Sequence, residues 1–236
     1  MILTGVKNWL IELIFPIRCA GCFKITSNKK KNRLICSDCL TQLKPSLYLH
    51  CPNCEARTVA GAPCLVCKDK TAIDNLATPL SYKEKTVQKI IKAYKYDFIR
   101  ELSNPISKIL LDYINIDNDF KNWHIVSVPL HKRRLNYRGY NQAELIAEQI
   151  SKELDLEIIQ GLARIKYKKP QAELEKQKRL ENIKGVFKCL CPEKIKNRNI
   201  ILVDDVYTTG ATMNECARIL KENGAKKVAG LAIARG

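Results

Sequence analysis

Two adjacent carboxylates, Asp204 and Asp205, follow an apolar run in the stretch IILVDDVYTTGATM, residues 200–213. A segment of small and hydroxyl-bearing residues comes next and leads into a sequence with helical spacing. In a parallel sheet, ligands bind where the carboxyl ends of the strands give way to loops. The stretch therefore predicts a binding site at the end of a buried strand.

The loop after the two acids has the composition of a phosphate cradle. Backbone N–H groups at the start of a helix point into one concavity, and the helix dipole favours an anion there. A glycine permits a close approach of the backbone, and threonine hydroxyls add donors. The residues that we assign to this cradle are Thr208, Thr209, Gly210, Ala211 and Thr212.

The two carboxylates do not suit a phosphate group, because both carry negative charge. They suit the 2′ and 3′ hydroxyls of a ribose, or a divalent cation that the ligand brings with it. Acids and cradle can therefore stand together if they bind different parts of one molecule. The sequence predicts that this molecule is a sugar that carries phosphate groups.

A second group of ligand-type residues is made of cysteines, eight of which form four C-x-x-C pairs in the first seventy residues. A zinc ion takes four ligands in a tetrahedron, and a two-residue gap lets one turn present two thiolates. A disulfide framework and a redox pair are the other interpretations. All four pairs keep metal-knuckle spacing, and redox chemistry needs one pair, so we predict two structural zinc ribbons. The ligands are Cys19, Cys22, Cys36, Cys39, Cys51, Cys54, Cys64 and Cys67.

The four cysteine pairs can be assigned to the two zinc ions in two ways. Consecutive pairs can share an ion, or the pairs can alternate between the two ions. The spacers of thirteen, eleven and nine residues suit consecutive hairpins, so the consecutive scheme is preferred. The other cysteines, Cys189, Cys191 and Cys216, lack this spacing and are expected to be structural or incidental.

A basic segment, HKRRLNYRGYNQ, follows the apolar run WHIVSVPL at residues 123–130. We expect a loop that ends at a helix beginning near Gly139. Arginine forks match phosphate oxygens, so a loop in this place predicts an anion site. A solvated basic turn is the alternative. The basic residues are Lys132, Arg133, Arg134 and Arg138.

The whole chain has 236 residues and a formal net charge of +17. A strongly basic chain attracts nucleic acid, nucleotides or an acidic membrane surface, unless its source makes lysine-rich proteins in general. The apolar opening, residues 2–15, is interrupted by Glu12, lacks a cleavage site and is too short to span a membrane. We expect a short amphipathic helix there, a cytoplasmic location and reduced cysteines.

Strand and helix patterns alternate after residue 70. Strands are expected at residues 75–82, 123–130, near 188, 199–203 and 228–234, and helices at 84–96, 101–113, 142–154 and 211–223. This alternation predicts an α/β fold with a mainly parallel sheet flanked by helices. The expected domains are residues 1–70, with the first helix and the double zinc ribbon, and residues 71–236.

The order of these motifs resembles a known family. The stretch IILVDDVYTTGAT is similar to the phosphoribosyl pyrophosphate (PRPP) motif of type I phosphoribosyltransferases. Four cysteine knuckles, IIKAYKYDFIRELSNPIS, VPLHKRRLNYRGYNQAELIA and KPQAELEKQKRLENIKGVF precede it, as in the ComF competence family. The resemblance covers nearly the whole chain and implies a phosphoribosyltransferase-like fold.

The resemblance also implies roles for single residues. Asp204 and Asp205 would hold the ribose hydroxyls of PRPP, residues 208–212 would wrap its 5′-phosphate, and magnesium would accompany it. Lys95 and the segment after Pro129 would lie near the pyrophosphate, with Arg133, Arg134 and Arg138. Residues 168–184 correspond to the mobile hood of this fold, with Gln171, Arg179 and Asn182 as its expected site residues.

Thr208 stands where many purine-salvage members carry an acid that handles the proton of the base. No general base is therefore visible in this chain. The catalytic candidates reduce to Asp204, Asp205 and Thr208, and the acceptor is not identified.

Three functions fit these observations. The first is a PRPP-binding protein of DNA uptake that binds single-stranded DNA and links a translocase to recombination mediators, in the cytoplasm or at the inner face of the membrane. The second is a metabolic transferase that salvages a nitrogenous base. The third is a zinc-ribbon regulator with a nucleotide sensor, weakened by the lack of a helix-turn-helix. Tyr137, Tyr140 and Tyr167 stand among basic residues and could stack bases, although Tyr140 suits core packing equally well.

Overall fold

The computed structural model describes residues 16–26, 34–114, 120–167 and 183–236. The helix expected at residues 2–15 lies outside them. Within the described residues, no helix combines the length and the apolar character that a membrane crossing requires.

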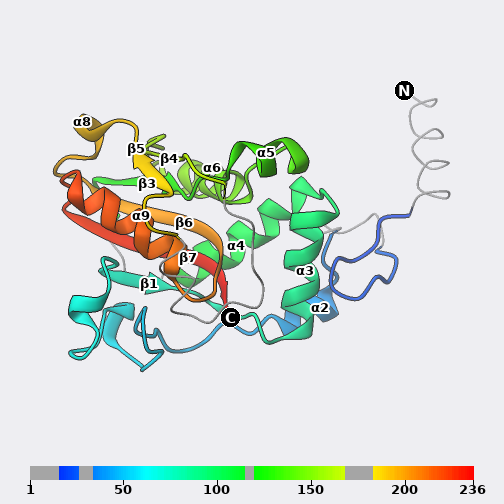
Figure 1. Cartoon of the computed structure of the whole chain (residues 1–236). Coiled ribbons are helices and arrows are strands. Elements are labelled where there is room, and N and C mark those ends of the chain that lie inside the picture. The colour runs from blue at the N-terminus through cyan, green and yellow to red at the C-terminus, as the bar shows by residue number, and fades with distance from the viewer. Residues whose placement is uncertain (1–15, 27–33, 115–119, 168–182) are drawn as a thin grey trace.

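The centre of the molecule is a parallel sheet with the strand order β1-β7-β6-β3 (Figure 1). The short strand β2 pairs with the carboxyl end of β7. All these pairings are parallel, so the expected α/β class is confirmed. The strands are β1 Asn75–Ala77, β2 Leu80–Ser81, β3 Trp123–Ser127, β6 Asn199–Tyr207 and β7 Lys227–Arg235.

Two hydrophobic layers cover the sheet, and β6 supplies side chains to both. Ile201 and Val203 pack in one cluster with the helices α3 (Lys85–Tyr96), α4 (Ser103–Ile114) and α6 (Gln142–Leu154). Ile200 and Leu202 pack in the other cluster with α9 (Ala211–Glu222). Successive residues of a strand face opposite sides, which explains this division. The helices are α2 Ser37–Gln42, α3 Lys85–Tyr96, α4 Ser103–Ile114, α5 Lys132–Arg138, α6 Gln142–Leu154, α8 Pro192–Ile195 and α9 Ala211–Glu222. Three short 3-10 turns are Val59–Gly61, Lys68–Lys70 and Arg100–Leu102.

Three expected strands differ from the observed ones by more than one residue. The strand expected at residues 123–130 ends at Ser127, two residues before Pro129, which has no N–H for the sheet ladder. The strand expected at residues 75–82 is divided into β1 and β2 by Thr78 and Pro79, because a proline has no N–H for the sheet ladder. The strand expected at residues 199–203 continues to Tyr207, since its pairing with β7 extends to Arg235. Asp204 and Asp205 therefore lie within β6 and not in the loop after it.

A separate antiparallel pair lies beside α9, formed by β4 Leu162–Arg164 and β5 Phe187–Cys189. The sequence predicted the strand near residue 188 but not β4. In the sequence, β4 precedes residues 168–182 and β5 follows them.

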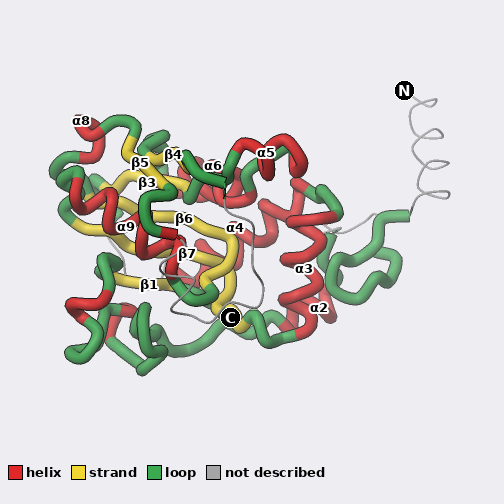
Figure 2. The backbone as a smooth tube through the Cα atoms, viewed as in Figure 1, coloured by secondary structure: helices red, strands yellow, loops and turns green. Residues whose placement is uncertain are grey.

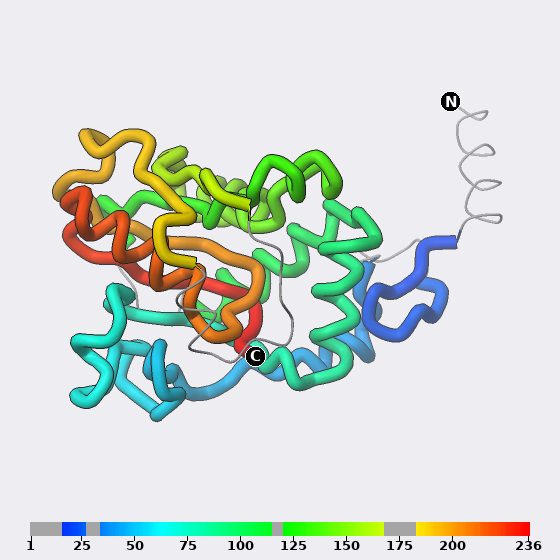
Figure 3. The backbone as a smooth tube through the Cα atoms, in the orientation of Figure 1, coloured from blue at the N-terminus to red at the C-terminus, as the bar shows by residue number. Residues whose placement is uncertain are grey.

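The two cysteine-rich segments lie on different sides of the sheet domain (Figure 3). The first, around Cys19, packs with α3 in the same hydrophobic cluster as α4 and α6. The second, residues 51–67, lies below β1 in this view and is mostly loop (Figure 2). The domain boundary at residue 70 stays a prediction.

Candidate functional site

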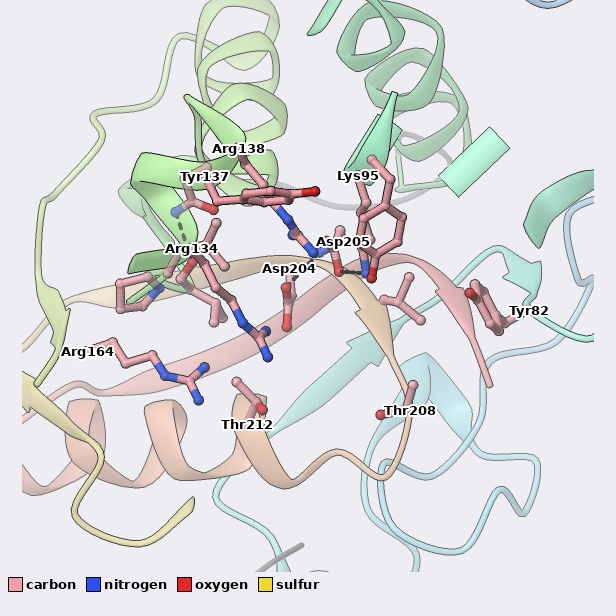
Figure 4. A pocket seen from close by; sticks show the side chains of 16 residues that line it. Tyr82, Lys95, Arg134, Tyr137, Arg138, Arg164, Asp204, Asp205, Thr208 and Thr212 are labelled. Carbon is pink, nitrogen blue, oxygen red and sulfur yellow. Dashed lines mark hydrogen bonds and ion pairs between the residues drawn. The ribbon is translucent and has the colours of Figure 1, made fainter. Parts of the chain in front are cut away.

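The two acids of β6 face different sides of the sheet. Asp205 continues the side of Ile201 and Val203, where α3 ends, and its Oδ1 lies 2.8 Å from Lys95 Nζ. Asp204 continues the opposite side, and its Oδ1 accepts a hydrogen bond of 2.8 Å from the Asp205 backbone N–H. Figure 4 shows Asp205 directed toward Lys95 and Asp204 directed toward Thr212. The alternation of a single strand thus separates the environments of two neighbouring carboxylates.

The electrostatics of the pair follow from this placement. Burial raises the pKa of Asp204 to about 7, and the charge of Asp205 acts in the same direction, against the opposing effect of Lys95. Burial would lower the pKa of Lys95, but its pairing with Asp205 outweighs burial and raises that pKa. Asp205 is therefore ion-paired with Lys95, while Asp204 forms no ion pair with a cation among the described residues.

The expected cradle forms the turn between β6 and α9. Gly210 is the residue before the helix, and its φ of 75° is a left-handed conformation that favours glycine. The Ala211 N–H donates to Thr209 Oγ1 over 3.4 Å. Thr208 and Thr212 line the cavity described next, whereas Thr209, Gly210 and Ala211 contribute the backbone of the turn.

A cavity of about 460 Å³ brings the expected groups together (Figure 4). Its walls come from the end of α3, the segment after β3, α5, β4 and the β6–α9 turn. The lining residues are Tyr82, Lys95, Tyr96, Val128, Pro129, Leu130, Arg134, Tyr137, Arg138, Asn141, Arg164, Asp204, Asp205, Val206, Thr208 and Thr212. The cavity therefore contains both acids, two cradle threonines, Lys95 and three arginines.

The basic segment after β3 is a helix, α5, and the expectation of a loop was wrong. His131 caps the helix by accepting from the Arg133 N–H, and Gly139 ends it with a φ of 71°. A seven-residue helix that is polar on most sides has no apolar periodicity by which to predict it.

The helical conformation divides the expected basic residues between two faces. Arg134 and Arg138 line the cavity, whereas Arg133 lies over the Tyr167 ring, 5.0 Å from its centroid, and Lys132 is exposed. Arg138 is buried, donates to Gln142 Oε1 over 3.0 Å and covers the Tyr96 ring.

Arg164 of β4 is a cavity residue that the sequence interpretation missed. Its Nε is buried without a hydrogen-bond partner, and no ion pair joins its guanidinium to any residue that the structure describes. Burial, and then the charge of nearby Arg134, lower the pKa of Arg164. A half-buried guanidinium beside a second cation is suited to an anion. The one available signal was the basic stretch ARIKYKK, residues 163–169.

Three expected site residues, Gln171, Arg179 and Asn182, lie outside the described residues. Their roles stay predictions.

The eight knuckle cysteines form two clusters, in each of which all sulfur atoms lie within 4.8 Å of one another. One cluster holds the first two pairs and the other holds the last two, so the consecutive grouping is confirmed and the crossed one is excluded. Four sulfurs at this separation could hold a structural zinc ion. Cys189, Cys191 and Cys216 belong to neither cluster.

The first cysteine of each cluster has the character of a metal ligand. Burial raises the pKa of Cys19, but backbone N–H donors including Gly21 and Cys36 outweigh it and lower the pKa to about 7. The same balance lowers the pKa of Cys51 to about 6. Thiolates that accept backbone hydrogen bonds fit zinc.

The fold, the acid pair and the turn before α9 define a phosphoribosyltransferase-type domain. A family model described as "Phosphoribosyl transferase domain" matches residues 141–235, which contain the acid pair and the cradle.

Longer matches extend over the cysteine clusters. Competence protein F of Haemophilus influenzae is 29% identical over 240 residues, 93% of this chain and 96% of that protein. Competence protein ComFC of Bacillus subtilis is 32% identical over 216 residues, 83% of this chain and 81% of that protein. DNA utilization protein YhgH of Escherichia coli K12 is 30% identical over 207 residues, 82% of this chain and 87% of that protein. The chain belongs to the ComF family of competence proteins.

Proposed function

We propose that the chain is a PRPP-binding protein of DNA uptake, which binds single-stranded DNA and links import to cytosolic recombination. The observation that carries the proposal is one cavity of about 460 Å³ that contains an acid pair, a cradle turn and three arginines. The names of the relatives, competence protein and DNA utilization protein, support the biological setting. We infer a cytoplasmic location, with a translocase and a recombination mediator as partners.

The proposed pose of PRPP follows from the charges. The β6–α9 turn binds the 5′-phosphate, and Asp204 and Asp205 accept hydrogen bonds from the ribose hydroxyls. Arg134 and Arg164 face the pyrophosphate from two elements. Magnesium, when it is bound with PRPP, would neutralise part of the pyrophosphate charge.

Calorimetric titration with PRPP, with and without magnesium and a single-stranded oligonucleotide, tests the site, the metal requirement and any coupling to DNA. A saturable, magnesium-dependent heat is expected. No heat of binding under any of these conditions would contradict the proposal.

The two cysteine clusters are proposed to hold one structural zinc ion each. Metal analysis of the purified chain is expected to find about two zinc ions, because each cluster offers a complete tetrahedron. Cys51→Ser is expected to reduce the content to about one ion and to lower the free energy of unfolding. Cys189→Ser, outside both clusters, is the matched control and keeps about two ions. Fewer than two ions in the unaltered chain would contradict the double zinc ribbon.

The proposed surface for single-stranded DNA lies at the rim of the cavity. Tyr137 is 71% exposed and packs edge-on against Phe98, which is 47% exposed. Tyr167 contacts both His131 and Arg133. Tyr140 is excluded, since it is buried and its hydroxyl donates to the Tyr94 carbonyl. Exposed rings beside guanidinium groups stack bases without reading them.

Tyr137→Ala is expected to weaken the binding of an unstructured oligonucleotide by about five- to a hundredfold, the effect of one lost stacking contact. Fluorescence anisotropy at several salt concentrations measures both this loss and the expected decrease of affinity with salt. The control is Tyr48→Ala, because Tyr48 is another exposed tyrosine, 50% exposed, but does not line the cavity and lies between the two cysteine clusters. Equal losses in the two variants, or affinity that does not change with salt, would count against this surface.

The alternative is a metabolic phosphoribosyltransferase that transfers phosphoribose to a nitrogenous base. The same cavity favours it, because basic groups and a cradle are what displacement of pyrophosphate requires. Thr208 is exposed and cannot act as a general base at neutral pH. Release of pyrophosphate from PRPP with one member of a panel of bases would favour the transferase over the binding protein.

A further inference from the structure

The second cysteine cluster touches the strands that carry the site. Tyr207, the last residue of β6, donates its hydroxyl to the Pro52 carbonyl over 2.8 Å. Arg235, the last residue of β7, donates to the Cys51 carbonyl over 2.9 Å and to the Pro52 carbonyl over 3.1 Å. Both carbonyls belong to the Cys51–Cys54 knuckle, so three hydrogen bonds join one metal knuckle to the carboxyl ends of two neighbouring strands.

The Tyr207 contact is buried, and the two Arg235 contacts are partly buried. Tyr207 is 3% exposed, and the Arg235 guanidinium lies over its ring at 5.3 Å from the centroid. The Gly236 N–H donates to the Tyr207 carbonyl over 2.9 Å. The hydroxyl of Tyr207 cannot find water as a substitute at this depth, which makes its bond to the knuckle costly to lose.

Tyr207 also sets the shape of the phosphate cradle. A Cβ atom built on Gly210 would lie 2.2 Å from the Tyr207 hydroxyl oxygen, so the backbone of the turn rests directly against this side chain. Gly210 immediately precedes α9. A displacement of the Tyr207 ring would therefore shift the turn from which the N–H groups of the cradle project.

The first cluster has no comparable connection to the site in the part of the chain that the structure describes. Its Gly21 lies near Thr86 at the start of α3, and its buried cysteines pack in the cluster of α3, α4 and α6. Among the described residues, no hydrogen bond or ion pair joins the first cluster to residues 204–212.

We propose that the second cysteine cluster is a structural part of the phosphate-binding site, with Tyr207 and Arg235 as positioning residues. When metal is bound, the knuckle holds its two carbonyls in place, the carbonyls hold Tyr207, and Tyr207 holds the turn at Gly210. Affinity for the 5′-phosphate then depends on metal in the second cluster and not on metal in the first. The identity of the ligand rests on the proposed function.

The experiment compares the affinities of magnesium PRPP and of ribose 5-phosphate for the zinc-loaded full chain and three variants. Tyr207→Phe removes only the hydroxyl, and Cys54→Ser removes an exposed ligand of the second cluster. Both are expected to bind each compound about tenfold more weakly, because both compounds use the cradle. Cys22→Ser, the matched control in the first cluster, is expected to stay within about twofold of the unaltered chain.

A second measurement, hydrogen exchange of the amides of residues 208–212, reports the cradle without any ligand. Exchange is expected to become faster in Tyr207→Phe and Cys54→Ser and to stay unchanged in Cys22→Ser. If Cys54→Ser does not fold, Tyr207→Phe decides.

Unchanged affinity and exchange in Tyr207→Phe, or losses of the same size in Cys22→Ser, would overturn the inference. Failure of the unaltered chain to bind PRPP would instead remove the proposed function, and the exchange measurement would still decide the role of the cluster.

Discussion

The double variant Asp204→Asn, Asp205→Asn is expected to lose measurable affinity for magnesium PRPP while the chain stays folded. Both carboxylates lie in the cavity, and each is proposed to accept hydrogen bonds from the ribose or to face the cation. A hydrogen bond to a charged group contributes about 1.5–3 kcal/mol, so two losses together weaken binding by about a hundredfold or more.

The fold is expected to tolerate the change because two effects oppose each other. Lys95 loses its partner at Asp205, but the repulsion that raises the pKa of Asp204 disappears. Calorimetry and thermal unfolding of the double variant provide the measurement. The control is Asp97→Asn, an exposed residue just after α3 that does not line the cavity. Unchanged PRPP affinity in the double variant would show that the ligand binds elsewhere.

The same pair predicts how affinity depends on pH. Asp204 has a pKa of about 7, so it carries a proton in much of the population below that pH. Only the ionised form accepts hydrogen bonds with both oxygens or faces a cation, so affinity for PRPP is expected to rise from pH 6 to pH 8.

The contribution of Asp204 to the free energy of unfolding has the opposite trend with pH. Its proton is held more tightly in the folded state, so that contribution falls as the pH rises from about 4 to about 7.

Arg134→Ala combined with Arg164→Ala is expected to weaken PRPP binding by about a hundredfold and to leave ribose 5-phosphate binding unchanged. The two guanidinium groups line the cavity from α5 and β4, and neither forms an ion pair with a residue that the structure describes. Ribose 5-phosphate lacks the pyrophosphate that these arginines are proposed to face. Comparison of the two ligands therefore assigns the arginines to one end of PRPP.

The matched control for this variant is Arg133→Ala. Arg133 stands beside Arg134 on α5 but lies over Tyr167 and does not line the cavity. Thermal stability of the double variant is expected to stay the same or to increase, since the repulsion between two cations is removed. An equal loss of ribose 5-phosphate affinity would mean that the arginines hold the 5′-phosphate instead.

The parts of the fold that could be predicted were the helices whose apolar residues recur regularly at helical spacing. The helices expected at residues 84–96, 142–154 and 211–223 are observed within one residue at each end, because each buries a regular apolar face. The cysteine clusters could be predicted for a different reason. Their C-x-x-C spacing identifies the ligand-type cysteines, and the short spacers favoured the consecutive grouping that the sulfur positions show.

The parts that could not be predicted depend on contacts between distant residues. The helix α5 is defined by a cap at His131 and a stop at Gly139, and β4 is defined by its pairing with residues 187–189. Arg164 enters the cavity only because of that pairing. The bond from Tyr207 to Pro52 joins residues 155 positions apart, and no local pattern indicates it.

The opposite orientation of Asp204 and Asp205 on β6 makes this strand intolerant of insertions and deletions. Suppose that one residue is added or removed between Ile200 and Val203 while β6 stays paired with β3 and β7. Each later side chain of β6 would then point to the opposite face of the sheet. Asp204 would then face the end of α3, and Asp205 would face α9. A substitution in this core strand by a residue of similar volume can be accommodated when the neighbouring side chains repack. A change in the length of the strand cannot be accommodated in this way.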